Sequence, residues 1–412
     1  MKLNNIYLNS ILSKVFLIFL SFVNSIVINR YLGPDLRGEY ALLLNISNIL
    51  AVVLGFNITS SYPYFLRKYK DNILEKINNI VLFQTFSYIA TLYFIYLYGS
   101  SPEVMILLTL SIITQLSNQL DFISIVKNIN KRNKIVTVSG IIQTLLLITM
   151  YFLTNENLYY IVGTLIFFHL FKIFMYMLFN KPKITLKLNS KLMTREVLKF
   201  SFFPMLTSLL TILNYNMDVI ILKFFVENRE IGLYSLAVTL ASMLWIIPDA
   251  FKDVLFNKTA QNDSIDALKF SIKINLYFSF IVIIIFSVFG NGFISFIYGE
   301  EFSKSFLVSL ILISGTIPMI FFKLISTLYQ AVGKQHYSFY TLALSVLINF
   351  VFNVITIPFM GIIGAAISSV FSYLICGLIM LSTFKKLYNI RLKDFFIVNS
   401  NELNILKKKF NK

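Results

Sequence analysis

The sequence predicts an all-α membrane protein with about twelve transmembrane helices in two six-helix lobes around a central cavity. Three observations support this fold class. The chain has 412 residues with a mean hydropathy of +0.76, long apolar runs recur along its whole length, and positive charge gathers in every second connection between the runs. A helix needs about 20 apolar residues to cross the hydrocarbon core. Loops rich in Lys and Arg stay on the cytoplasmic side, so this alternation is typical of a polytopic membrane protein.

The apolar runs define the elements in order. Twelve candidate spans cover residues 8–29, 40–65, 77–98, 103–126, 134–154, 157–179, 200–222, 232–256, 270–290, 305–330, 337–357 and 361–383. Gly99 with Pro102, and Asn155 with Glu156, mark short turns between neighbouring spans. The longest hydrophilic stretches are too short to bury a core of their own, so we expect no soluble domain.

The distribution of Lys and Arg predicts the orientation of the spans. The connections on the predicted outer side hold only five of the 36 Lys and Arg residues: Arg30, Arg37, Lys223, Arg229 and Lys304. Both termini are therefore expected to be cytoplasmic. The net charge of +17 favours contact with anionic membrane lipids. It does not favour nucleic acid, because the charge is divided among short loops.

The segment 180–199 is the longest internal basic stretch, and it separates six spans from six spans. A short repeat supports this division, because Gly38-Glu39-Tyr40 precedes the second span and Gly232-Leu233-Tyr234 precedes the eighth. Two such repeats are typical of transporters with the substrate path between them. The predicted parts are an N-terminal lobe (1–180), a cytoplasmic linker (181–199), a C-terminal lobe (200–384) and a basic cytoplasmic tail (385–412).

Charged residues inside the spans are the candidates for function, because each costs about 2.5–3.5 kcal/mol at the bilayer centre on insertion scales. They are Lys14, Asp121, Lys172, Asp218, Lys223, Asp249, Lys252, Asp253 and Lys323. Asp218 is the strongest candidate, since it ends a polar stripe of Thr207, Thr211 and Asn214 and a carboxylate cannot extend far towards the interface.

Other interpretations of these residues remain open. Lys14, Lys172 and Lys323 could extend along the span to reach the interface. Asp249 and Lys252, spaced i, i+3, could form only a local ion pair. The Ser and Thr stripes could serve helix packing alone.

Enzyme and cofactor motifs are absent from the sequence. There is no Walker A segment, no Gly-x-Gly-x-x-Gly and no His-Glu-x-x-His, and two His with one Cys disfavour a metal centre. We expect a protein that is not an enzyme and carries no cofactor, driven by an ion gradient or by the gradient of its substrate.

Three motifs in order resemble the bacterial polysaccharide-export flippases. The first is Arg30-Tyr31-Leu32-Gly33-Pro34 followed by Gly38-Glu39-Tyr40. The second is Asp218 with Leu222, followed by Gly232-Leu233-Tyr234-Ser235. The third comprises Asn349, Asn353, Pro358 and the run Gly361–Ala366. The chain is similar in these motifs to O-antigen flippases of the Wzx type, in the multidrug/oligosaccharidyl-lipid/polysaccharide (MOP) superfamily.

This resemblance implies a flippase for an undecaprenyl-diphosphate-linked oligosaccharide in the bacterial inner membrane, working by alternating access. A polymerase and a chain-length regulator of the same pathway are the possible protein partners. Under this hypothesis Lys14, Asn24, Lys223 and Lys323 contact the headgroup, and Asp218 and Asp121 serve ion coupling or gating. The alternatives are a drug or cation antiporter of the same superfamily and a membrane O-antigen polymerase, which usually has a larger outer loop.

Overall fold

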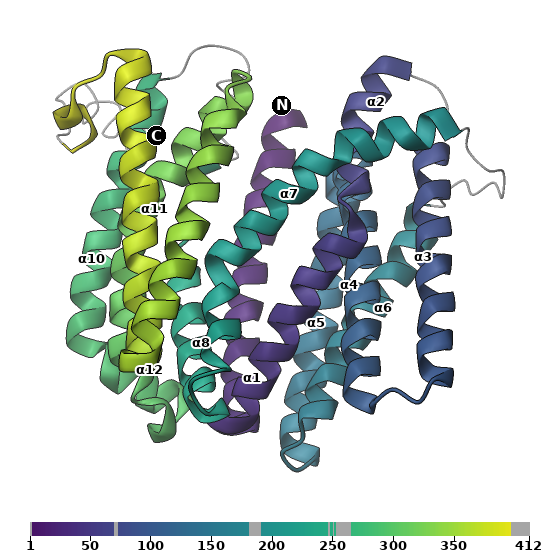
Figure 1. Cartoon of the computed structure of the whole chain (residues 1–412), viewed down its shortest axis with the longest axis horizontal. Coiled ribbons are helices and arrows are strands. Elements are labelled where there is room, and N and C mark those ends of the chain that lie inside the picture. The colour runs from purple at the N-terminus through teal and green to yellow at the C-terminus, as the bar shows by residue number, and fades with distance from the viewer. Residues whose placement is uncertain are drawn as a thin grey trace. The chain divides into compact units, whose positions relative to one another are not determined.

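The computed structural model describes residues 2–69, 73–180, 191–245, 248–249, 251–252 and 265–396; within these ranges it consists of helices joined by short turns, and there is no strand. The chain separates into two compact units, residues 1–213 and 214–412. In each unit long helices run side by side (Figure 1). The all-α membrane fold predicted from the sequence is confirmed.

The first unit is built around the long helix α1 (Lys2–Gly55), which packs against α4 (Pro102–Lys127), α5 (Ile129–Leu153) and α6 (Leu158–Asn180). A 3₁₀ turn, η1 (Ile58–Ser61), and the short helix α2 (Tyr62–Tyr69) lead to α3 (Ile73–Leu97), which lies against α4. Buried apolar side chains of α1, α4, α5 and α6 form one core cluster, and those of η1, α2 and α3 form another.

The second unit has α11 (Ser305–Ala331) at its centre, packed against α12 (Gln335–Tyr388), α8 (Asn228–Met243) and α10 (Ile265–Tyr298). Helix α7 (Lys191–Leu222) belongs to both units, since the boundary falls after Leu213. Short 3₁₀ turns, η2 (Glu300–Phe302) and η3 (Leu392–Phe395), lie before α11 and after α12.

Two helices are broken by a glycine in a conformation that other residues rarely adopt. Gly33 in α1 has φ 62° and is followed by Pro34, while Gly361 in α12 has φ 53° and follows Pro358. Proline lacks the amide hydrogen that would continue a helix, and glycine tolerates positive φ. Each helix therefore supplies two spans without a loop between them, where the sequence suggested connections at 29–39 and 358–361.

Side chains join the two halves of each broken helix. In α1 the buried Arg37 donates from Nε to Oδ1 of Asn29 at 3.1 Å, across the Gly33 break. In α12 the Thr356 hydroxyl lies 3.0 Å from the carbonyl oxygen of Gly364 and 2.8 Å from the Ser368 hydroxyl. These bonds satisfy polar groups near the breaks.

The helix count follows from these breaks. Nine helices in the described ranges are long and apolar enough to cross a membrane, and α1 and α12 are the two that the glycines divide. Helix α8, with 16 residues, is shorter than a full span. Counting α1 and α12 twice and adding α8 reproduces the twelve predicted spans. The chain is a multi-pass membrane protein, and large apolar side chains such as Phe86, Phe152 and Phe289 are exposed where lipid would contact them.

The predicted lobe boundaries and the predicted central cavity stay predictions. Residues 181–190 of the linker and 397–412 of the tail lie outside the described residues, and residues 191–199 form the start of α7.

Glycines allow α11 and α12 to approach closely. A Cβ added at Gly377 of α12 would lie 2.2 Å from the carbonyl oxygen of Pro318 in α11, and one added at Gly315 would lie 2.9 Å from Val370 Cγ2. Small residues at such a contact bring two helix backbones together. The position of α11, which carries Lys323, therefore depends on Gly377.

We predict that Gly377→Ala destabilises the protein by about 1–3 kcal/mol, because the added methyl group meets backbone rather than a movable side chain. The measurement is the thermal unfolding midpoint of the purified protein in detergent. Gly163→Ala in α6 is the matched control, since no atom lies within 4 Å of its added Cβ; it should leave the midpoint unchanged or raise it. Equal midpoints for Gly377→Ala and the wild type would contradict the prediction.

Candidate functional site

The predicted site residues fall into both units. Lys14, Asn24 and Asp121 belong to the first, and Lys223, Asp218 and Lys323 belong to the second. The surroundings of four of them differ. Asp218 lies in a buried hydrogen-bonded network, and Lys323 forms an ion pair beside an aromatic ring. Asp121 forms an ion pair that joins three helices, and Lys223 lies at a surface groove.

Asp218 is the centre of the buried network. Its side chain is 1% exposed, and three neutral groups donate to the carboxylate. The Tyr234 hydroxyl from α8 lies 2.5 Å from Oδ2, Asn353 Nδ2 from α12 lies 2.8 Å from Oδ1, and the Ser369 hydroxyl from α12 also donates to Oδ2. A buried carboxylate is held here by hydrogen bonds from two other helices, without a cation among these donors.

The network continues along α12 and back to α7. Asn353 Nδ2 also donates to Asn349 Oδ1 at 2.8 Å, and Asn349 Nδ2 lies 3.2 Å from the Ser369 hydroxyl. Asn214, one turn before Asp218, accepts at Oδ1 from the Ser345 hydroxyl at 3.0 Å. Two buried polar atoms, Asn353 Oδ1 and Asn214 Nδ2, have no hydrogen-bond partner within the described ranges. The network thus keeps spare acceptor and donor capacity near the carboxylate.

Lys323 lies in a second polar cluster of the same unit. Its Nζ is 3.0 Å from both carboxylate oxygens of Asp249 and 4.7 Å from the centre of the Trp245 ring. The lysine side chain is 12% exposed and that of Asp249 is 52% exposed. The i, i+3 spacing suggested Lys252 as the partner of Asp249, but the ion pair observed joins Asp249 to α11.

Aromatic rings lie between this cluster and the Asp218 network. The ring of Trp245 packs 4.3 Å from that of Tyr215 in α7 and 6.1 Å from that of Tyr373 in α12, measured between ring centres. The Tyr373 hydroxyl donates to the backbone carbonyl of Asn214 at 3.4 Å. A displacement at Lys323 can therefore be transmitted through packed side chains to the helix that carries Asp218.

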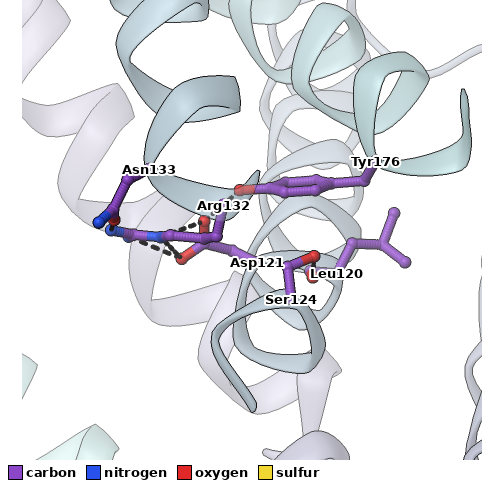
Figure 2. Close-up of polar contacts among 6 residues, drawn as sticks. All are labelled: Leu120, Asp121, Ser124, Arg132, Asn133 and Tyr176. Atoms are coloured by element: carbon purple, nitrogen blue, oxygen red, sulfur yellow. Dashed lines mark hydrogen bonds and ion pairs between the residues drawn. The ribbon is translucent and has the colours of Figure 1, made fainter. Parts of the chain in front are cut away.

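Asp121 has a different environment (Figure 2). Arg132 from α5 binds its carboxylate through two nitrogens, with Nε 3.0 Å from Oδ1 and Nη2 2.9 Å from Oδ2. The Tyr176 hydroxyl from α6 donates to the same carboxylate. Bidentate charge-assisted hydrogen bonds of this kind are among the strong ones in proteins. Asp121 thus joins α4, α5 and α6.

The two candidates on α1 lie in its first half. Lys14 is exposed and Asn24 is half-buried. The Oδ1 atom of Asn24 is enclosed and has no hydrogen-bond partner within the described part of the chain. Asn24 therefore resembles Asn353 in keeping an amide oxygen available.

Lys223 lies at a groove of about 690 Å³ on the second unit. Its Nζ donates to Asn228 Oδ1 at 2.8 Å. Arg229 and Lys304 line the same groove together with Glu227 and Glu230. All three cations that the sequence assigns to outer connections of this unit therefore meet at this groove.

Sequence reasoning identified Asp218 but not its partners. Tyr234 and Asn353 stand in the motifs used above only as family markers, the Gly-x-Tyr and Asn-x-x-x-Asn segments. Their presence in those motifs was the feature of the sequence that could have pointed to them. Trp245 gave no signal beyond being the only Trp in the chain, because its contact with Lys323 joins residues 78 positions apart.

Comparisons with known proteins agree with this architecture. Residues 7–248 match the family described as "Polysaccharide biosynthesis protein". No curated protein matches the chain.

Solved structures with the same fold include a lipid II flippase, MurJ, in an inward closed conformation (TM-score 0.69, 20% identity, 95% of this chain and 88% of that chain covered). An inward-facing multidrug resistance MATE transporter of the MOP superfamily has a TM-score of 0.64, 13% identity and coverage of 93% and 99%. A MOP superfamily transporter from Pyrococcus furiosus has a TM-score of 0.60, 13% identity and coverage of 92% and 94%.

The family match covers more than half of the chain, and the fold is that of flippases and transporters rather than of enzymes. This chain belongs to the polysaccharide biosynthesis protein family and has the fold of the MOP superfamily.

Proposed function

We propose that this protein is a flippase that moves an undecaprenyl-diphosphate-linked oligosaccharide, an O-antigen or similar repeat unit, across the bacterial cytoplasmic membrane by alternating access. The family membership and the fold shared with a lipid II flippase support a lipid-linked substrate. The observation that carries the proposal is the half-buried ion pair of Lys323 and Asp249 on the Trp245 ring, inside a membrane helical unit. Charged groups retained in such surroundings usually serve a substrate or ion path.

The headgroup has two chemical parts that need different contacts. Its diphosphate is anionic and suits Lys323 and Lys14, since cations form short, strong hydrogen bonds with phosphate oxygens. Its sugars present hydroxyl groups, which suit amide side chains such as Asn24, whose Oδ1 has no partner within the described part of the chain. Lys223 belongs to the groove at the predicted outer end, so we assign it to the stage at which the headgroup leaves.

Asp218 is our candidate for ion coupling. A buried carboxylate is costly unless its charge is balanced, and the three groups that donate to Asp218 are neutral. Binding of H⁺ or Na⁺ would balance the charge, and the unpartnered Asn353 Oδ1 is a further oxygen ligand nearby. Loss of the ion would then favour rearrangement of α7 against α8 and α12, which is how a gradient can drive the cycle.

Asp121 receives a different assignment. Its carboxylate already binds Arg132 and Tyr176 from two other helices (Figure 2). We propose that Asp121 holds these helices together as a unit, and that ion coupling rests on Asp218.

The proposed topology places both termini in the cytoplasm, so that the basic connections face the anionic lipids of the inner leaflet. Release of the substrate on the outer side would supply a polymerase and its chain-length regulator, the proposed protein partners.

A cation or drug antiporter is the second candidate. The accessible carboxylate of Asp249 beside the Trp245 ring would also suit a cationic ligand, and MATE transporters share the fold. The two candidates differ in the sign of the ligand charge, which the experiments below can measure.

We predict that Lys323→Ala and Asp218→Asn each reduce surface polysaccharide about tenfold or more in a strain that depends on this gene, a change within the usual range of coupling energies. Lys14→Ala should reduce it less, because Lys14 is exposed. Polysaccharide is quantified by gel electrophoresis, with protein amounts measured by immunoblot.

Lys269→Ala, in α10 and outside the proposed path, is the control. Normal polysaccharide at normal protein amounts in all three variants would refute these site assignments.

We predict that Asp121→Asn destabilises the protein by about 2 kcal/mol, since it leaves the partly buried Arg132 without its partner. The double variant Asp121→Asn/Arg132→Gln should recover part of that loss. Thermal unfolding in detergent measures both, and polysaccharide export per folded molecule should be unchanged. A wild-type midpoint with abolished export would instead assign Asp121 to the transport path.

We predict that Glu156→Cys reacts with a membrane-impermeant maleimide in intact spheroplasts, whereas Lys131→Cys reacts only after the membrane is permeabilised. Both positions are exposed at opposite predicted sides, and the native Cys376 is buried. The reverse labelling pattern would invert the proposed topology.

A further inference from the structure

Helix α8 is shorter than a full span. It has 16 residues, about 24 Å of helix, and the chain turns at Leu244 and Trp245 directly after it. Trp245 and Asp249 both follow this end.

The ion pair beside the end of α8 is asymmetric. Lys323 is 12% exposed and stands on α11, whose backbone is held by the contact of Pro318 with Gly377. Asp249 is 52% exposed and stands on the short segment that follows the turn. An incoming ligand would therefore meet the carboxylate first, and the ammonium would keep its place while the carboxylate moves.

The hydrogen-bond donors around Asp249 favour an anion. The Lys323 ammonium, on a side chain that is 12% exposed, is one of them. The indole N–H of Trp245 is enclosed and has no hydrogen-bond partner within the described ranges. A phosphate group could bind the Lys323 ammonium, and rearrangement at the turn would offer its oxygens to the unused indole donor.

We propose that Asp249 is an internal counter-ion of Lys323 that a diphosphate group displaces, so that Lys323 and Trp245 form a diphosphate subsite. Asp249 neutralises Lys323 while the subsite is empty and competes with the ligand for it. This inference rests on the proposed function for its substrate class, and it adds Asp249 as a residue that tunes affinity by competition.

The chain provides its own probe of this subsite, because Trp245 is its only tryptophan and lies 4.7 Å from the Lys323 ammonium. The experiment titrates the full-length protein in lipid nanodiscs with inorganic pyrophosphate at constant ionic strength and follows tryptophan emission. Parallel titrations use orthophosphate, undecaprenyl diphosphate and the cation tetraphenylphosphonium.

We expect a saturable change of emission with pyrophosphate in the wild type, and a stronger response to undecaprenyl diphosphate if the lipid also binds. Asp249→Asn should bind pyrophosphate about fivefold to tenfold more tightly, because the competing charge is gone. Lys323→Gln should bind it at least about tenfold more weakly. Asp266→Asn is the matched control, since it removes the same charge from an exposed position at the start of α10 and should leave the affinity unchanged.

The sign of the Asp249→Asn effect decides the inference. Weaker or unchanged pyrophosphate binding in Asp249→Asn would overturn it. Pyrophosphate binding of wild-type affinity in Lys323→Gln would also overturn it, and this second variant decides the question if Asp249→Asn does not fold. Tighter tetraphenylphosphonium binding in the wild type than in Asp249→Asn, without a pyrophosphate response, would overturn it in favour of a cation site. A strain assay without loss of polysaccharide, combined with the expected pyrophosphate results, would refute the proposed flippase function and leave the subsite standing.

Discussion

The carboxylate of Asp218 is the interaction on which the second unit depends. Tyr234 from α8 and Asn353 and Ser369 from α12 all donate to it, so the three helices α7, α8 and α12 meet at one buried charge. Water cannot solvate that charge at 1% exposure, and the neighbouring hydrogen-bond donors do so instead. Protonation or ion binding at this carboxylate would change the bonds of three helices at once, which is the property that a coupling residue needs.

The two broken helices show how a membrane chain can turn without a loop. Gly33 with Pro34 and Pro358 with Gly361 interrupt α1 and α12, and Arg37 and Thr356 bind polar groups on the other side of each break. Thr356 donates to a backbone carbonyl beyond its break, whereas Arg37 binds a side chain across the other. The breaks occur at the first and last predicted outer connections of the chain, and in each the glycine of a family motif has the positive φ.

Two ion pairs of the spans differ in their neighbours. Asp121 and Arg132 form a bidentate pair across adjacent helices, with Tyr176 as a third member. Such a pair stabilises packing and has little charge left for a ligand. Lys323 and Asp249 form a pair whose acidic member is half exposed and whose basic member rests on an aromatic ring. The same residue types thus serve helix packing in one unit and, in our proposal, ligand binding in the other.

The sequence by itself determined the membrane class, the number of spans and the family resemblance, because hydropathy and charge act locally along the chain and leave periodic patterns. It also singled out Asp218 and Lys323, since a charge inside an apolar run is visible without any structure. Only the tertiary structure decided their partners. Asn353 lies 135 residues from Asp218, and Asp249 lies 74 residues from Lys323. Which polar groups meet depends on how α7, α8, α11 and α12 pack, and that packing is set by side-chain volume and by close contacts such as Gly377 with Pro318, which no local pattern records.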